Sequence, residues 1–157
     1  KSWAETSPYI SQLQAVSQEM STRVAPDLQW DLVFQSRSGP PSVPWLEPDI
    51  IDYLDQLDTD SVDTVLVVPI GFLSDHMEVQ FDLDTQAFNH AQERGIQMFR
   101  APTVGVNQTF VSMIRDLIEE AIEGKELVAE YGDPWECSPQ CCAINANTQS
   151  RSRNQES

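Results

Sequence analysis

Three apolar runs at regular spacing constrain the fold of this chain more than any other feature. They occupy residues 30–35, 63–70 and 97–100. They begin roughly 33 residues apart, which is about the length of one βαβ unit. The middle run holds four consecutive apolar residues, 65–68, and such a run is typical of a strand buried on both faces. The spacing therefore predicts an α/β fold with a doubly wound parallel sheet, arranged as three αβα layers.

Helical periodicity fills the intervals between these runs. Pro26 ends the first predicted helix, Ser74 caps the third, Gly95 ends it, and Asn107 caps the last. The predicted helices cover residues 9–24, 48–57, 74–93 and 107–121. The apolar side of the third helix is expected to consist of Met77, Phe81, Phe88 and Ala91.

The length of 157 residues suits a single domain with a core of its own. We expect this α/β domain to cover residues 1–135, with residues 1–25 as a connecting helix. Residues 136–142 form a separate segment rich in cysteine. Residues 143–157 contain little that could be buried, and we expect this tail to be disordered.

The charge balance restricts the possible partners. The chain has 25 acidic against 9 basic residues and a formal net charge of −16. A nucleic acid or an anionic membrane surface would be repelled, and cations are the better partners. No apolar run reaches the length of a membrane span, and no signal peptide is expected before the first helix. We therefore expect a cytoplasmic protein.

An acidic cluster follows the middle strand after a short turn at Gly71. Asp75, Glu78 and Asp82 are spaced by three and four residues, so on an α-helix they would share one face, with His76 about a quarter-turn away. The cluster lies at the carboxyl end of a parallel strand, where open α/β sheets bind ligands. Acidic residues in a first helical turn also favour the positive helix end and can simply face water. Both interpretations remain open at this level.

The loop after the first run contains three prolines and a glycine, so its backbone is stiff and irregular. It presents Gln35, Ser36, Arg37 and Trp45. The alternative for Trp45 is that its ring covers part of the core.

All three cysteines, Cys137, Cys141 and Cys142, fall within six positions. A secreted disulfide framework normally distributes an even number along the chain. Metal or iron–sulfur ligation fits better, together with a reducing compartment. The alternative is a set of free thiols in a flexible tail.

Two sequence blocks show a resemblance to a known family. The first is QSRSGPP at residues 35–41 followed by WLEPD at 45–49, and the second is PIGFLSDHMEV at 69–79. Both resemble signature blocks in the C-terminal half of ferrochelatase. The resemblance covers roughly residues 7–122. The residues of these blocks, with FDLDT after DHMEV, are similar to those of the actinobacterial branch, whose enzymes insert iron into coproporphyrin III.

The resemblance implies a lyase in which a porphyrin sits between two similar α/β domains and receives Fe²⁺. This chain would be the C-terminal half. The N-terminal half would be a partner that carries the family's conserved histidine, which has no counterpart here. Gln86 stands where relatives often have Glu, which weakens the outer end of an acidic ladder. The implied catalytic residues are Glu78 and His76, the metal-binding residues are Glu78, Asp82 and Asp75, and the substrate-binding residues are Trp45, Phe72, Gln35, Ser36 and Arg37.

The chemistry of metal insertion agrees with this residue set. Insertion requires the removal of two pyrrole protons and of water from the metal. A carboxylate such as Glu78 can accept a proton or act as a transient hard ligand, and which group does which is left open. Some family members carry a [2Fe–2S] cluster, and Cys137, Cys141 and Cys142 resemble three of its ligands, with a fourth from the other half.

Three questions stay open from the sequence. The porphyrin could be coproporphyrin III or protoporphyrin IX. The chain could instead belong to a cobalt or sirohydrochlorin-type chelatase, because carboxylates and histidines at a strand end do not encode the metal. It could also be a non-catalytic module that binds a metal or an iron–sulfur cluster.

Overall fold

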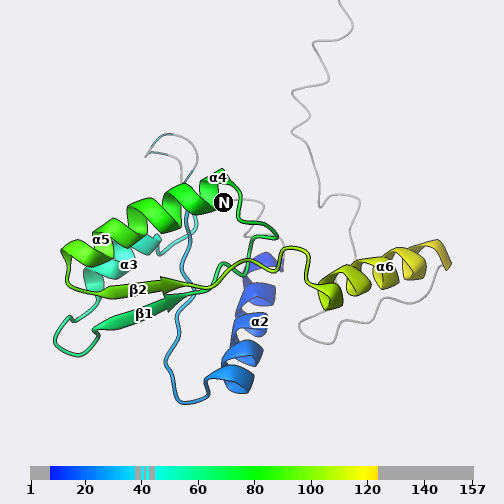
Figure 1. Cartoon of the computed structure of the whole chain (residues 1–157), viewed down its shortest axis with the longest axis horizontal. Coiled ribbons are helices and arrows are strands. Elements are labelled where there is room, and N and C mark those ends of the chain that lie inside the picture. The colour runs from blue at the N-terminus through cyan, green and yellow to red at the C-terminus, as the bar shows by residue number, and fades with distance from the viewer. Residues whose placement is uncertain (1–7, 38–39, 41, 43–44, 124–157) are drawn as a thin grey trace, which may run out of the picture.

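The computed structural model describes residues 8–37, 40, 42 and 45–123, and its strands form a two-stranded parallel sheet that lies beneath a long helix (Figure 1). Strand β1 (Thr64–Val67) pairs in register with β2 (Gln97–Arg100), so that Val65 lies opposite Met98. These are two of the three predicted strands. An α/β chain with a parallel sheet is thus confirmed in its coarse form.

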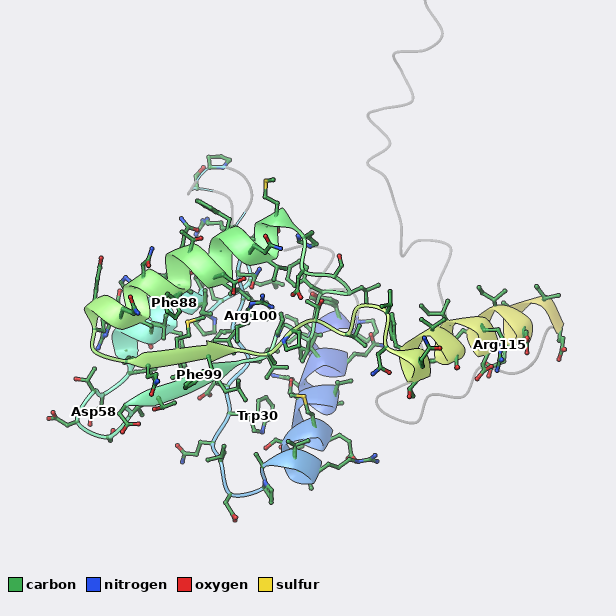
Figure 2. All side chains as sticks on the ribbon, in the orientation of Figure 1. Trp30, Asp58, Phe88, Phe99, Arg100 and Arg115 are labelled. Carbon is green, nitrogen blue, oxygen red and sulfur yellow. The ribbon has the colours of Figure 1, made fainter. Side chains whose placement is uncertain are left out.

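The sheet has one covered face and one open face. Val65, Val67 and Met98 belong to the core or pack against it. Leu66 and Phe99, which alternate with them, are 64% and 51% exposed. Figure 2 shows Phe99 on the side of the strands away from the helical layer. The described residues therefore form one helical layer on one face of the sheet, where the sequence predicted layers on both faces.

The helical layer consists mainly of one continuous helix. It runs through α4 (Met77–Val79), the π-helical segment η1 (Gln80–Ala87) and α5 (Phe88–Glu93). Gly95 follows at φ 76°, a left-handed conformation that glycine adopts without a steric penalty. The end of this helix is as predicted, but its start is three residues later than expected.

The π-helical segment changes which side chains face the core. Its hydrogen bonds run from residue i to residue i+5, so each turn takes up more residues than an α-helical turn. The residues buried along the helix are spaced by four, and they are Val79, Leu83, Ala87 and Ala91. Met77 and Phe81 are 84% and 54% exposed. The predicted apolar side is therefore wrong for Met77 and Phe81, because it assumed an α-helical repeat.

A short helix, α3 (Ile50–Gln56), completes the layer. The Asp49 carboxylate caps it by accepting a hydrogen bond from the Ile51 amide at 2.9 Å. Arg94 and His90 attach α3 to α5. The Arg94 guanidinium donates to the Leu57 carbonyl at 2.9 Å, and the His90 ring lies 2.8 Å from the Asp55 carboxylate. The buried core of the described residues is Ile50, Leu54, Val79, Leu83, Ala87, Ala91, Ile96 and Met98.

The first predicted strand does not form. Residues 30–35 make a single bridge, in which Phe34 pairs with Asp49. A strand needs a hydrogen-bonded neighbour along its length. β1 pairs with β2, and within the described part of the chain nothing pairs with the other edge of β1. The predicted doubly wound, three-layer arrangement is therefore not present in these residues.

The remaining two helices lie away from the sheet. α2 (Tyr9–Val24) ends just before Pro26, as predicted. Its apolar residues do not join the core, and Val16 and Val24 are 46% and 78% exposed. α6 (Gln108–Glu123) projects from the far end of β2 (Figure 1). The Asn107 side chain caps it as predicted, accepting from the Thr109 amide at 3.0 Å.

Several expectations fall outside the described residues. They are the prediction of a separate cysteine segment at 136–142, the prediction that residues 143–157 are disordered, and the predicted domain boundary at 135. No helix in the described part of the chain is long and apolar enough to cross a membrane.

Candidate functional site

The candidate site lies at the carboxyl end of the two parallel strands. β1 leads into the buried Pro69 and a tight turn, in which the Phe72 amide donates to the Pro69 carbonyl at 3.3 Å. β2 ends at Arg100 on the same edge of the sheet. This edge is where open α/β sheets place their ligands, and both sequence blocks approach it.

His76 provides the cap of the helix that begins at this edge. Its Nδ1 accepts a hydrogen bond from the Val79 amide at 3.4 Å. Its ring meets the edge of Phe72, with ring centroids 5.2 Å apart. The prediction that Ser74 caps the helix is wrong, because the backbone of His76 is extended (ψ 173°) and a helix cannot begin before Met77.

Glu78 and Asp82 follow on the helix, and they differ in their surroundings. Glu78 is exposed and, among the described residues, has no hydrogen-bond or ion-pair partner. Asp82 is half-buried and accepts a hydrogen bond from the Ser36 hydroxyl. The Gln35 side-chain amide in turn donates to Ser36 Oγ at 3.4 Å.

Ser36 has an unusual backbone conformation. Its φ is 61°, in the left-handed region that costs a non-glycine residue about 1–2 kcal/mol. Its hydrogen bond to Asp82 joins the first sequence block to the helical segment that follows the second block, across 46 positions of chain. Strained backbone conformations of this kind cluster at functional sites.

Asp75 takes part in an ion-pair network that lies outside the acidic face. The Arg100 guanidinium donates to Asp75 Oδ1 at 2.7 Å, and its other nitrogens donate to both Asp84 oxygens at 2.5 and 2.8 Å. The Thr103 amide also donates to Asp75 Oδ1, at 3.3 Å. Figure 2 shows Arg100 between the strands and the long helix. The predicted common face of Asp75, Glu78 and Asp82 is wrong for Asp75, which precedes the helix.

Protonation equilibria reflect this network. Partial burial alone would raise the pKa of the Asp75 carboxyl, but hydrogen bonds from Thr103 and Arg100 bring that pKa below its ordinary value. The Asp84 carboxylate raises the pKa of Arg100 against the opposing effect of burial, and Asp75 adds to the increase. Asp75 is therefore charged at neutral pH and already paired.

The structure brings together some of the predicted site residues and separates others. Ser36 and Asp82 are joined, and His76 contacts Phe72. Trp45 is half-buried and Arg37 is exposed. No three His, Cys, Asp or Glu side chains in the described residues lie close enough to hold a metal ion, so Glu78, Asp82 and Asp75 are not a preformed ligand set. Cys137, Cys141 and Cys142 lie outside the described residues.

Sequence reasoning missed Arg100 and Asp84. The available signal was a basic residue at the carboxyl end of the third run, on the same sheet edge as the acidic cluster. Arg100 compensates the charges of Asp75 and Asp84. Within the described residues, Glu78 and Asp82 have no cationic partner. An exposed, unpaired carboxylate can accept a proton or bind a hard cation transiently.

Comparisons with known proteins agree with this arrangement. A family model described as ferrochelatase matches residues 1–122. A coproporphyrin III ferrochelatase from Leifsonia xyli subsp. xyli is 42% identical over 147 residues, which cover 89% of this chain and 38% of the relative. A ferrochelatase from Rhodopirellula baltica is 47% identical, covering 73% of this chain and 34% of the relative.

A coproporphyrin III ferrochelatase from Mycobacteroides abscessus is 46% identical over 126 residues, covering 73% of this chain and 37% of the relative. The chain thus spans between a third and two fifths of the length of these relatives. The family model covers more than half of the chain and includes both sequence blocks and the whole strand-end edge. This chain belongs to the ferrochelatase family.

Proposed function

We propose that this chain forms part of a lyase that inserts Fe²⁺ into a porphyrin in heme biosynthesis, with coproporphyrin III as the favoured substrate. The observation that carries the proposal is Glu78, a carboxylate at the carboxyl edge of the sheet that is exposed and has no partner among the described residues. Relatives from Leifsonia xyli and Mycobacteroides abscessus that match this edge are named coproporphyrin III ferrochelatases.

Glu78 is the better proton acceptor of the two proposed catalytic residues. Insertion of one Fe²⁺ releases two pyrrole protons from the ring. While His76 Nδ1 accepts the Val79 amide, a neutral imidazole carries its proton on Nε2 and can donate there but not accept. Both carboxylate oxygens of Glu78 are without a partner in the part of the chain that the structure describes, so either can accept a proton. His76 then contributes by holding the helix start and orienting Glu78.

The proposed metal contacts narrow to Glu78 and Asp82. Asp75 was also a candidate, but its carboxylate is engaged by Arg100 and Thr103. A metal that reaches Asp82 would compete with the Ser36 hydroxyl for the same carboxylate. Two carboxylates hold Fe²⁺ loosely, which suits a metal that must be passed on to the ring.

For the porphyrin we propose contacts with the loop side chains and Phe72. Coproporphyrin III carries carboxylate substituents, and the exposed Arg37 is suited to bind one of them. Trp45 and Phe72 would contact the flat apolar ring, and Gln35 and Ser36 would border it. The side chain of Ser36 would lie at the border of the ring while it donates its hydrogen bond to Asp82.

The remaining parts of the proposal concern the longer protein. Leu66 and Phe99 lie on an exposed face of the sheet, and no described strand pairs with the second edge of β1. Both features fit a doubly wound, three-layer domain that is completed by further chain, including the N-terminal half. A [2Fe–2S] cluster on Cys137, Cys141 and Cys142 and a cytoplasmic location rest on the sequence alone. Absorption and electron paramagnetic resonance spectra of anaerobically purified protein would test for the cluster.

Metal insertion by the 157-residue chain is the direct test of this function. The chain would be purified anaerobically and given Fe²⁺ with coproporphyrin III or protoporphyrin IX. Metallation would be followed by the change in porphyrin absorption. The same assay would be run with the portion of the Leifsonia xyli relative that this chain does not match. Turnover in either setting supports the proposal.

The other outcomes favour the other functions. Turnover with Co²⁺ but not Fe²⁺ would favour a cobalt chelatase, and turnover only with a sirohydrochlorin-type ring would favour that enzyme class. Metal binding without turnover in either setting would favour a non-catalytic module.

Glu78→Gln tests the residue that carries the proposal. We expect metal insertion to fall by roughly 10²–10⁴-fold, the usual contribution of a positioned acid or base. We expect the free energy of unfolding to change by less than about 0.5 kcal/mol, because the Glu78 side chain is exposed and unpaired within the described residues.

Glu93→Gln is the matched control. Glu93 is also an exposed carboxylate on the same long helix, but it lies at the opposite end. We expect full activity in this variant. A Glu78→Gln protein that keeps most of its activity would remove Glu78 from the mechanism.

A further inference from the structure

We propose that Arg100 is a positioning residue for the metal-inserting site, and this inference rests on the function proposed above. Arg100 holds the segment that carries Glu78 and neutralises the two neighbouring carboxylates that do not take part. It lies outside both sequence blocks, at the end of β2.

Geometry provides the first argument. The side chain of Arg100 is 16% exposed, and its nitrogens bind one oxygen of Asp75 and both oxygens of Asp84. Its Nη1 also donates to the Ala101 carbonyl at 3.1 Å. Only the planar, forked guanidinium can satisfy this set, since a lysine offers a single nitrogen.

The order of the contacts along the chain provides the second argument. Asp75 lies three residues before Glu78, and Asp84 lies six residues after it. One guanidinium therefore anchors both ends of the segment that presents Glu78. The anchor at Asp75 is directly next to His76, whose ring and carbonyl accept the amides of Val79 and Gln80.

Charge provides the third argument. Asp75, Glu78, Asp82 and Asp84 lie within ten positions of a chain with a net charge of −16. Arg100 compensates Asp75 and Asp84, whereas Glu78 and Asp82 have no cationic partner in the described part of the chain. Without Arg100, Asp75 and Asp84 would be two further carboxylates that could bind the metal away from the ring.

Amide hydrogen exchange in Arg100→Gln and Arg100→Lys tests this role without relying on activity. The amides of Val79 and Gln80 report on the helix start, and the Ile96 amide, bonded to the Ala91 carbonyl at 2.9 Å, reports on the core. Charged hydrogen bonds of this kind shift local opening by roughly tenfold to a hundredfold. We expect such an increase at Val79 and Gln80 in both variants, and little change at Ile96.

Kinetics provide the second readout, in whichever setting the unsubstituted protein turns over. We expect kcat for metal insertion to fall roughly tenfold to a hundredfold, while KM for the porphyrin changes little, because the ring contacts stay in place. Arg100→Lys should restore less than half of the lost kcat, because it retains the charge but not the fork.

Arg94→Gln is the matched control. Arg94 is also a partly buried arginine that joins two elements, through Asp55 and the Leu57 carbonyl, but it lies away from the strand-end edge. We expect it to increase exchange at Ile96 as much as at Val79, and to leave kcat of the folded protein unchanged.

The two proposals fail in different ways. If the unsubstituted protein shows no turnover, the proposed function fails, and the exchange data still decide whether Arg100 holds the helix start. If it turns over and Arg100→Lys keeps full kcat, or if exchange rises equally at Ile96 and Val79, the positioning role is refuted while the function stands.

Discussion

Replacing Leu83 by alanine is the sharpest test of the helical register that places Glu78 and Asp82. Leu83 is 1% exposed and lies in the π-helical segment. Its neighbours along the buried side include Ala87 and Ala91, which are too small to fill the space left by the lost side chain. Burial of this kind makes Leu→Ala cost about 2–5 kcal/mol, and we expect about 3–4 kcal/mol here.

The comparison variant is Phe81→Ala. An α-helical repeat would place Phe81 on the core side, but in the structure it is 54% exposed. We expect a cost of about 1 kcal/mol or less, since most of the ring stays in water in either case. The π-helical register therefore predicts a difference of about 2–3 kcal/mol between the two variants, in a direction opposite to the size of the side chains.

Equilibrium urea unfolding, followed by far-ultraviolet circular dichroism, measures both values. Because the total stability of a small domain is only about 5–15 kcal/mol, Leu83→Met serves as a milder variant, with an expected cost below about 1.5 kcal/mol. A Phe81→Ala variant that is destabilised as much as Leu83→Ala would refute the register and the placement of the acidic residues that follows from it.

Three further predictions concern single side chains. Thermal unfolding should show that Ser36→Gly is about 1 kcal/mol more stable than Ser36→Ala. Both variants lose the hydroxyl, but only glycine adopts a φ of 61° without steric strain. Equal stabilities would argue against strain at this position. Burial, together with a hydrogen bond to Asp31, raises the pKa of Tyr53 from 10.0 to about 12, so its stabilising contribution is complete below pH 10 and is lost as pH rises through about 12. Phenolate absorbance would be titrated in the unsubstituted protein and in Tyr53→Phe, and the difference between the two curves reports the ionisation of Tyr53 alone. We expect this difference curve to be centred near pH 12, and one centred near pH 10 would contradict the prediction. A hydrogen bond with His90, and then one with Arg94, lowers the pKa of Asp55 below 3.8. The contribution of Asp55 to the free energy of unfolding is therefore complete above that pH and is lost on further acidification. Asp55→Asn should flatten that part of the acid unfolding curve, and an unchanged curve would show that Asp55 is not paired with His90 and Arg94 in solution.

The positions of several elements could be predicted from local sequence because their signals are local. The strand at 64–67, in which Thr64, Val65 and Val67 are β-branched, and the Asn107 cap depend on residues that are near one another in the chain. The family resemblance is carried by two contiguous blocks and is confirmed by the family match. In contrast, the prediction of the first strand was wrong, because a strand needs a neighbouring strand to pair with. The pattern of residues within a segment does not show whether such a neighbour is present.

The sequence by itself thus determined the four helices of the described residues, two of the three strands, the edge at which the acidic residues gather, and membership of the ferrochelatase family. Only the tertiary structure decided which of those acidic residues have a cationic partner among the described residues. Arg100 reaches Asp75 and Asp84 from another strand, and Ser36 reaches Asp82 across 46 positions. Such long-range contacts cannot be predicted from the sequence, because electrostatic pairing acts through space and does not appear in the periodicity of the chain.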